Sequence, residues 1–279
     1  NMLVFLAWQA ALLYTVTRLT GSRALGWAAF GLVLGLAGPW AADAGSAVDF
    51  RLDHAAVCLF GITACVALLT DDFRSRGWSL AFGAMTGVTL LERFLTGAYF
   101  APLFVLTAMW LLRYPDRWLR IRHLVMAGLV TTVMALPFFW LQRSIIYGYY
   151  WSGHITGNEA AARVRATEFW PSIRFVFEHL THIHLGAWLG WMVLAVLAGL
   201  AILFLLGPRK RAGGLAPSWL FFSCAWWLVP ALILTLHRQK SEYVLGVIAP
   251  GLVLLVLWLC WMLWSRIDFD SGRPGRRWL

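Results

Sequence analysis

Long apolar runs separated by polar stretches fill the chain from its first residues to about residue 264. A helix that crosses a bilayer needs about 20 mostly apolar residues. Nine segments meet or nearly meet that length, and we predict a helical span in each: 2–17, 24–42, 54–70, 78–95, 97–112, 123–140, 186–206, 217–236 and 243–264. The pattern therefore predicts an all-α, polytopic integral membrane protein.

One polar stretch, residues 141–185, is much longer than the other connections. Long loops of this kind are commonly functional, and candidate helices lie in it around 158–168 and 171–182. We predict six N-terminal spans in residues 1–140, a partly helical outer-side loop or cap in 141–185, three further spans in 186–264, and a basic tail in 265–279.

Composition supports the same class of protein. Of the 279 residues, 61% are hydrophobic and 13% are charged, whereas soluble domains contain about 45–50% apolar and about 25% charged residues. An ordinary soluble domain and a disordered chain are both excluded. The four cysteines lie in apolar runs without CxxC spacing, so we interpret them as small hydrophobic residues and predict no disulfide framework or zinc site.

The basic residues alternate from loop to loop. One side collects 15 of the 23, namely Arg18, Arg23, Arg74, Arg76, Arg113, Arg117, Arg120, Arg122, Arg209, Lys210, Arg211, Arg266, Arg273, Arg276 and Arg277. Because Lys and Arg accumulate in cytoplasmic loops, we attribute the net charge of +10 to topology and predict no nucleic-acid partner. We predict a multi-pass protein of the cell (inner or plasma) membrane whose active face is extracytoplasmic.

This topology places residue 1 outside the cell membrane. The chain enters an apolar run by Leu3, with no charged segment of the signal-peptide kind before it. We therefore expect at least one further span and one outer loop before Asn1.

Charged residues on the predicted outer side are candidates for chemistry. Arg93 ends an apolar helix, where an ionisable group costs about 2.5–3.5 kcal/mol and is usually functional or paired. It could pair with Glu92 or reach the membrane interface, or it could bind a lipid phosphate or a functional carboxylate. Arg51 and Asp53 lie where a loop meets the next helix, and they could form only an exposed charged loop. As a site, Arg51 could hold a phosphate, and Asp53 could act as a general base or orient another catalytic residue.

A second outer feature is the turn at 237–243, which contains Arg238, Lys240 and Tyr243. It could be a plain basic turn. A cluster of cations on the outside, however, suits recognition of a phosphate, with the Tyr as a hydrogen-bond donor. We expect Arg51, Asp53, Arg93 and this turn to face one cavity between the membrane and the outer surface.

The long loop carries aromatic residues and three histidines. The aromatics, Tyr147, Tyr149, Tyr150 and Trp151, suit either a membrane interface or the stacking of a sugar. His179, His182 and His184 are poorly spaced for three metal ligands on one helix. We predict no metal site and no cofactor, and the sequence gives no support for a divalent metal.

The order of four motifs resembles the GT-C superfamily of polytopic glycosyltransferases, in particular the bacterial group related to protein O-mannosyltransferases and lipid A aminoarabinose transferases. The motifs are Leu12–Arg23 with its RxxGSR end before a helix that closes on Pro39; Arg51-Leu52-Asp53; Gly83 and Gly87 leading to Leu90-Leu91-Glu92-Arg93, then Pro102; and Lys240-Ser241-Glu242-Tyr243 with Pro250. The last departs from the family's KxxxYxxPxxP, since the Lys-to-Tyr spacing is three and Gly246 replaces the first Pro. The resemblance covers nearly the whole chain from the second family helix onward.

The resemblance implies transfer of a sugar from a polyprenyl-phosphate donor to a lipid, glycan or protein acceptor on the outer face. It also implies that the family's catalytic Asp, or Asp-Glu pair, lies in a first outer loop before Asn1, which leaves Asp53 as the second choice for the base. Arg51, Arg93, Arg238, Lys240 and Tyr243 are the candidates for binding the donor phosphate. The main alternative is a membrane transporter or lipid-linked sugar flippase, and a non-enzymatic membrane scaffold is a further one.

Overall fold

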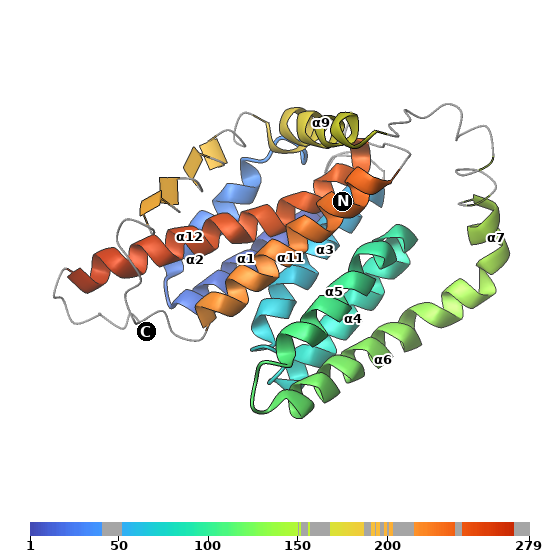
Figure 1. Ribbon diagram of the computed structural model, residues 1–279, viewed down its shortest axis with the longest axis horizontal. Helices are drawn as coiled ribbons and strands as arrows, with labels where there is room; N and C mark the ends of the chain where they lie inside the picture. Colours follow the sequence, from blue (N-terminus) through green and yellow to red (C-terminus); the bar gives the residue numbers. More distant parts are fainter. Residues whose placement is uncertain are drawn as a thin grey trace.

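The computed structural model describes residues 1–40, 52–149, 151, 156, 168–186, 191–192, 194–195, 198–199, 201–202, 215–237 and 242–270. Within these residues every regular element is a helix (Figure 1). The helices are α1 (Met2–Thr20), α2 (Arg23–Leu34), α3 (Leu52–Leu69), α4 (Arg76–Glu92), η2 (Phe94–Thr96), α5 (Gly97–Leu111), α6 (Arg117–Leu141), α7 (Arg143–Tyr147), α9 (Phe169–His179), η4 (Leu180–Leu185), α11 (Leu215–Leu236), η5 (Glu242–Ile248) and α12 (Ala249–Asp270). The predicted all-α class is confirmed for the part of the chain described.

Five stretches are long and apolar enough to cross a membrane: Met2–Thr20, Phe94–Leu111, Arg117–Leu141, Pro217–Leu236 and Val244–Ser265. Two more, Arg23–Leu34 and Asp53–Leu69, are apolar but shorter. The helix predicted over 24–42 ends early at Leu34, because Gly35 and then Gly38-Pro39 interrupt it. Much of the predicted span 186–206 lies outside the described residues.

Helix α3 lies in the middle of the bundle and packs against α1, α4, α11 and α12 (Figure 1). Aromatic rings fill the space between these helices. The Phe60 ring lies 5.2 Å from Phe100 and 5.5 Å from Trp226, and the Trp226 indole donates to the Phe60 carbonyl oxygen at 3.3 Å. Burying the indole N–H without this acceptor would be costly, so the hydrogen bond helps to fix α11 on α3.

Helices α4 and α6 approach each other very closely. A Cβ atom at Gly83 would lie 2.3 Å from the carbonyl oxygen of Ala127, so only glycine fits there without a shift of the backbone. The Thr131 hydroxyl donates across the same contact to the Gly83 carbonyl oxygen at 2.8 Å. Small residues at such contacts are typical of helices that pack in membranes.

The face of α6 that points away from α4 is largely apolar, with Arg122 and Thr132 as exposed polar residues on it. Its exposed apolar residues include Trp118, Val125, Leu129, Val133, Leu136 and Trp140. The two tryptophans are 22 positions apart, about 33 Å along a helix, and a bilayer's hydrocarbon core is about 30 Å thick. This spacing suits a surface that faces lipid, with one tryptophan near each interface.

The two ends of the bundle differ in charge. We call the end where α1, α3 and α5 finish and α4 and α6 begin the arginine end. The other, where α3 and α5 begin and α4 finishes, is the Asp53 end. All the arginines of residues 18–122 except Arg51 and Arg93 belong to the arginine end.

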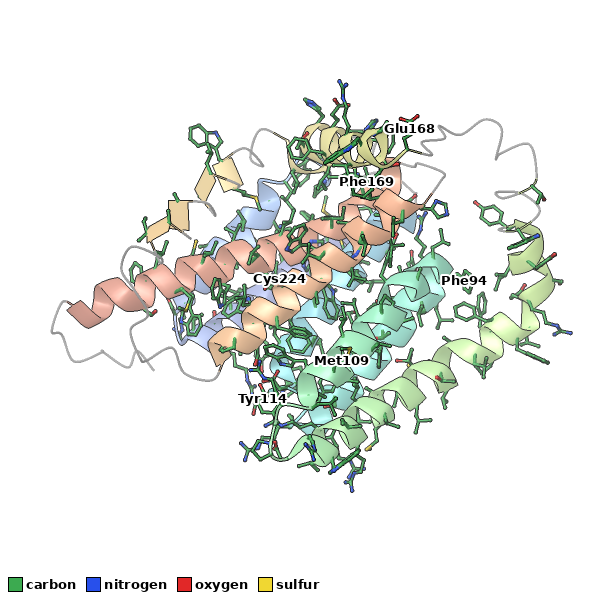
Figure 2. The ribbon with its side chains drawn as sticks, in the orientation of Figure 1. Phe94, Met109, Tyr114, Glu168, Phe169 and Cys224 are labelled. Atoms are coloured by element: carbon green, nitrogen blue, oxygen red, sulfur yellow. The ribbon has the colours of Figure 1, made fainter. Side chains whose placement is uncertain are left out.

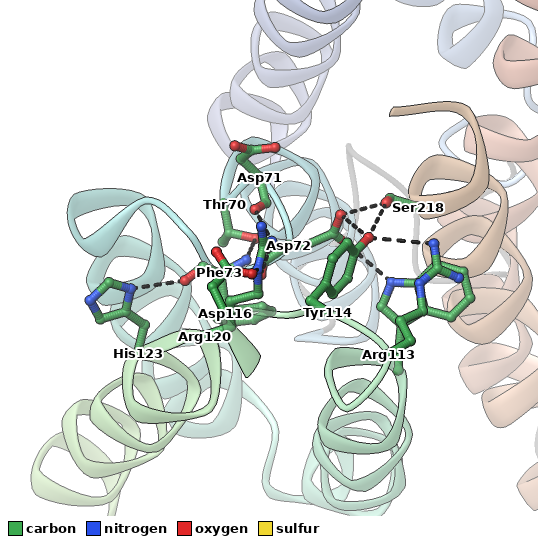
Figure 3. Close-up of polar contacts among 11 residues, drawn as sticks. Thr70, Asp71, Asp72, Phe73, Arg113, Tyr114, Asp116, Arg120, His123 and Ser218 are labelled. Carbon is green, nitrogen blue, oxygen red and sulfur yellow. Dashed lines mark hydrogen bonds and ion pairs between the residues drawn. The ribbon is translucent and has the colours of Figure 1, made fainter. Parts of the chain in front are cut away.

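A strained turn at the arginine end joins α3 to α4. Asp71, Asp72 and Phe73 have φ angles of 53°, 51° and 61°, a left-handed conformation that non-glycine residues rarely adopt in succession. The Arg120 guanidinium donates to the carbonyl oxygens of Asp71 at 3.0 Å and Asp72 at 2.9 Å, and His123 Nδ1 donates to that of Phe73 at 2.8 Å (Figure 3). Two α6 side chains thus stabilise three unusual backbone angles.

The Asp72 carboxylate links this turn to two further helices. Its Oδ2 accepts from the Tyr114 hydroxyl at 2.7 Å and from the Ser218 hydroxyl of α11 at 2.5 Å, and its Oδ1 accepts from the Trp110 indole at 3.1 Å. A buried carboxylate is tolerated when its lone pairs are used in this way. The network binds α3, α5 and α11 together at the arginine end (Figure 3).

In the long loop the structure describes α7, α9 and η4. The helix predicted over 171–182 is confirmed, because α9 runs from Phe169 to His179 and continues as the π-helix η4. Nearly all of the second candidate helix, 158–168, lies outside the described residues. Helix α9 packs on α11 and η5, and it exposes the rings of Phe169, Trp170 and Phe177.

Candidate functional site at the Asp53 end

Two of the predicted site residues meet at the Asp53 end. Asp53 lies in the first turn of α3, where the helix dipole favours a carboxylate. Arg93 follows the last residue of α4, and its guanidinium forms an ion pair with Oδ1 of Asp53. The side chains are 23% and 16% exposed, so the pair lies near the surface of the bundle and is partly shielded from solvent. Of the roles predicted for Arg93, the structure shows contact with a carboxylate.

Threonines fix the backbone that carries Arg93. Arg93 leaves α4 in an extended conformation, with φ −147° and ψ 106°. Its N–H donates to the Thr89 carbonyl oxygen at 3.0 Å, and its own carbonyl oxygen accepts from the Thr96 hydroxyl at 2.7 Å. The Thr89 hydroxyl lies 3.2 Å from that of Thr63 on α3, so the frame reaches the helix that carries Asp53.

The residue after Arg93 points toward a different helix. The Phe94 ring packs edge-on against Phe139 of α6, with ring centroids 5.2 Å apart (Figure 2). The extended conformation at Arg93 allows these two neighbouring side chains to reach α3 and α6 respectively. Helix α4 packs against both α3 and α6, so the two side chains extend these contacts past its end.

Two buried histidines lie at the same end. His54 follows Asp53, its Nε2 is 3.5 Å from the Cys58 sulfur, and its ring is 5.6 Å from Phe5. His184 lies in the π-helix η4, and both side chains are only 6% exposed. Such π-helical turns often occur at functional sites.

Two glycines make room for the His184 ring. A Cβ atom at Gly38 or at Gly246 would lie 3.0 Å from His184 Nδ1, and one at Gly246 would also lie 3.1 Å from Val57 of α3. The Gly38 N–H donates to the His184 carbonyl oxygen at 2.8 Å. Gly246, which stands where the resembled family has Pro, therefore allows η5 to pack directly on His184 and α3.

The remaining predicted site residues are not placed. Arg51, Arg238 and Lys240 lie outside the described residues, as does the side chain of Tyr243, whose backbone belongs to η5. Helix η5 begins two positions after Lys240 and packs against α3 and η4. Of the residues expected to face one cavity, the structure brings Asp53 and Arg93 into contact, and the shared cavity itself stays a prediction.

The three histidines of the long loop have different surroundings. His179 Nδ1 lies 2.9 Å from the Phe175 carbonyl oxygen, and its ring stacks on that of Phe175 at 3.9 Å. His184 is buried, whereas His182 is exposed. Among the residues that the structure describes, no three His, Cys, Asp or Glu side chains form a group that could hold a metal ion.

Several residues of this site carry no recognisable sequence motif. Thr89 and Thr96 are four positions before and three after Arg93, a spacing that could have suggested hydrogen bonds to its backbone. The sequence presents His184 only as a candidate metal ligand beside its neighbours. No family model, curated protein or solved structure matches the chain, so a function has to be inferred from the geometry of the site.

Proposed function

We propose that this protein is a membrane glycosyltransferase. It moves a sugar from a polyprenyl-phosphate donor to a lipid, glycan or protein acceptor on the extracytoplasmic face of the membrane. The observation that supports this function most directly is the partly exposed Asp53–Arg93 ion pair at the end of the bundle opposite the arginine end. A charged pair held at the edge of apolar helices is costly and usually functional.

The charges of the pair suit a sugar-phosphate donor. In the transfer, the acceptor oxygen bonds to the anomeric carbon, the bond from that carbon to the phosphate oxygen breaks, and its electron pair remains on the phosphate. A cation fixed beside the departing phosphate stabilises the transition state more than the ground state. A guanidinium has five N–H donors, so Arg93 can hold both Asp53 and a phosphate oxygen.

The other roles are assigned by position along the chain. Lys240, Arg238, Tyr243 and Arg51 add donors for the phosphate. Asp53 orients Arg93 and is the second choice for the general base that takes the acceptor proton, after a carboxylate in the outer loop expected before Asn1. The short distance in sequence from Lys240 to η5, which packs on α3, supports a shared site.

The orientation of the protein is part of this proposal. Nine spans place the Asp53 end and residues 141–185 outside and the arginine end in the cytoplasm. A single cysteine at position 158, in a background without the native cysteines, should react with a membrane-impermeant maleimide added from outside. Labelling only from the cytoplasmic side would contradict the orientation.

Transfer by purified full-length protein in liposomes tests the activity. Arg93→Gln removes the charge with little change in size and should lower transfer by about 10²–10³-fold, as expected for one lost transition-state donor. Asp53→Asn should also lower it, because Arg93 loses its fixed partner. Arg174→Gln is the matched control, since Arg174 pairs with Glu178 at 2.6 Å on the exposed face of α9.

The outcomes separate the functional classes. Loss of transfer in the Arg93 and Asp53 variants, with the Arg174 variant unchanged, supports the transferase. Movement of intact donor lipid across the membrane without sugar transfer would establish the flippase instead. Wild-type transfer in both Arg93→Gln and Asp53→Asn would show that the pair is only structural.

A further inference from the structure

Seven arginines crowd the arginine end without an acidic partner in the described part of the chain. They are Arg18, Arg23, Arg74, Arg76, Arg113, Arg117 and Arg122, and among the described residues none of them forms an ion pair with a carboxylate. By contrast, Arg93, Arg120 and Arg174 each have such a pair. Asp71, Asp72 and Asp116 also lie at this end, so the seven arginines leave its surface with an excess of positive charge.

One of these arginines is held in a fixed position. The Arg113 guanidinium lies 3.3 Å from the centroid of the Trp110 ring. The other face of this indole stacks on Phe221 at 4.2 Å with 8° between the planes, and its N–H donates to Asp72. Because the stack on Phe221 and the hydrogen bond to Asp72 fix Trp110, the guanidinium stacked on it is oriented at little further entropic cost.

Arg18 on α1 also lies beside aromatic rings, at a greater distance. Its guanidinium lies 5.9 Å from the Tyr14 ring and 5.7 Å from the Trp78 ring, and it donates to the Tyr14 hydroxyl at 2.7 Å. A guanidinium lying on an aromatic face still presents its edge, and two parallel N–H groups on that edge match two oxygens of a phosphate.

The surroundings of Arg113 favour a lipid over a soluble anion. Val105, Met109 and Leu112 precede it on the exposed side of α5, and they are 60%, 63% and 52% exposed. An apolar surface that ends in a stacked arginine matches an acyl chain that ends in a phosphate. The largely apolar face of α6 runs to the same end at Trp118.

We propose that the guanidinium group of Arg113, stacked on Trp110, and that of Arg18, held beside Tyr14 and Trp78, bind the phosphodiester headgroups of anionic phospholipids in the leaflet that contacts the arginine end. The acyl chains lie along the exposed face of α5. Asp71, an exposed carboxylate at this end, repels the bound headgroup and so weakens binding. The inference is independent of glycosyl transfer and of which leaflet is cytoplasmic.

Lipid binding by the purified full chain tests the proposal. In a neutral detergent, native mass spectrometry counts the phosphatidylglycerol molecules retained as that lipid is titrated, with phosphatidylcholine as the neutral comparison. Arg113→Gln should weaken phosphatidylglycerol binding about fivefold, the effect of one basic residue at an anionic surface. Arg113→Lys should lose less, because the charge remains. The matched control is Arg143→Gln at the Asp53 end, whose guanidinium lies 4.8 Å from the Trp140 ring.

A variant with the opposite sign sharpens the test. Asp71→Asn removes the exposed carboxylate, and Asn tolerates the φ of 53° found there, so binding of phosphatidylglycerol should strengthen. Glycerol phosphate at millimolar concentration should not displace the lipid, whereas displacement would show a site for soluble phosphate. Equal losses in Arg113→Gln and Arg143→Gln, or equal retention of phosphatidylcholine, would overturn the proposal.

Discussion

Replacing Arg120 by Met should destabilise the fold, because Arg120 fixes the left-handed turn at Asp71–Phe73. Its guanidinium is nearly buried and donates to two backbone carbonyl oxygens and to Asp116 at 2.7 Å. Met keeps most of the volume and removes every donor. Each buried carbonyl left without a donor costs about 1–3 kcal/mol, giving about 2–6 kcal/mol for the two, whereas Asp116 can be rehydrated. Relaxation of one left-handed residue returns about 1–2 kcal/mol, so we expect a net loss of about 1–4 kcal/mol.

Reversible unfolding by SDS in mixed micelles, followed by tryptophan fluorescence, measures this loss. Arg120→Lys should fall between the wild type and Arg120→Met, because an ammonium keeps the charge but cannot reproduce the planar fork. Arg122→Gln, exposed on the same helix, should stay within about 0.5 kcal/mol of the wild type. If Arg120→Met unfolds within that same margin, the turn does not depend on Arg120 and the reasoning is wrong.

Three further perturbations test separate parts of the structure. The hydrogen bond from Arg120 lowers the pKa of Asp116 below its ordinary value of 3.8. The stabilisation from this bond is therefore present above pH 3.8 and is lost as the pH falls through the lower pKa of the folded protein. Thermal unfolding of Asp116→Asn should differ from that of the wild type at about pH 5 and converge with it in stronger acid. Gly83→Ala should lower the free energy of unfolding by about 1–3 kcal/mol, because the new Cβ meets the α6 backbone. Gly77→Ala on the same helix places its Cβ in open space and should be neutral or stabilising. Unfolding by SDS measures both variants. Lys240→Ala should change the free energy of unfolding by no more than about 0.5 kcal/mol, whereas sugar transfer should drop about 10²–10³-fold. Lys240→Arg should retain part of the activity. Wild-type transfer in Lys240→Ala would mean that the turn only anchors the topology.

The helices were predictable from the sequence where each consists of a long run of apolar residues. The observed α1, α5, α6, α11 and α12 each overlap a predicted span, because a run of about 20 apolar residues has few alternatives to a helix. The meeting of Asp53 and Arg93 was also expected, since both lie at helix ends on the same predicted side. The early end of α2 was missed, because the apolar run continues through Gly35 and Gly38 although the helix does not.

The strained turn could not be predicted from its own residues. Asp71, Asp72 and Phe73 carry no glycine to signal positive φ angles, and the groups that stabilise them come from Arg120 and His123, about 50 positions away along the chain. Local propensity describes a segment's preference in isolation, and here tertiary hydrogen bonds override it. His184 is a similar case, since its burial depends on glycines in two distant segments.

The arginines at the two ends of the bundle differ in their partners, and the two proposed roles follow from this difference. At the Asp53 end, Arg93 is partly buried against a carboxylate, so a ligand there must share a guanidinium that is already oriented. At the arginine end, Arg113 stacks on an indole and has no carboxylate partner among the described residues. The whole positive charge of its guanidinium is therefore available to attract a phosphate. An arginine already paired with a carboxylate binds a phosphate less tightly but holds it in a fixed orientation, which suits the proposed stabilisation of a transition state. An unpaired arginine binds a ground-state phosphate more tightly, which suits the proposed lipid that stays bound.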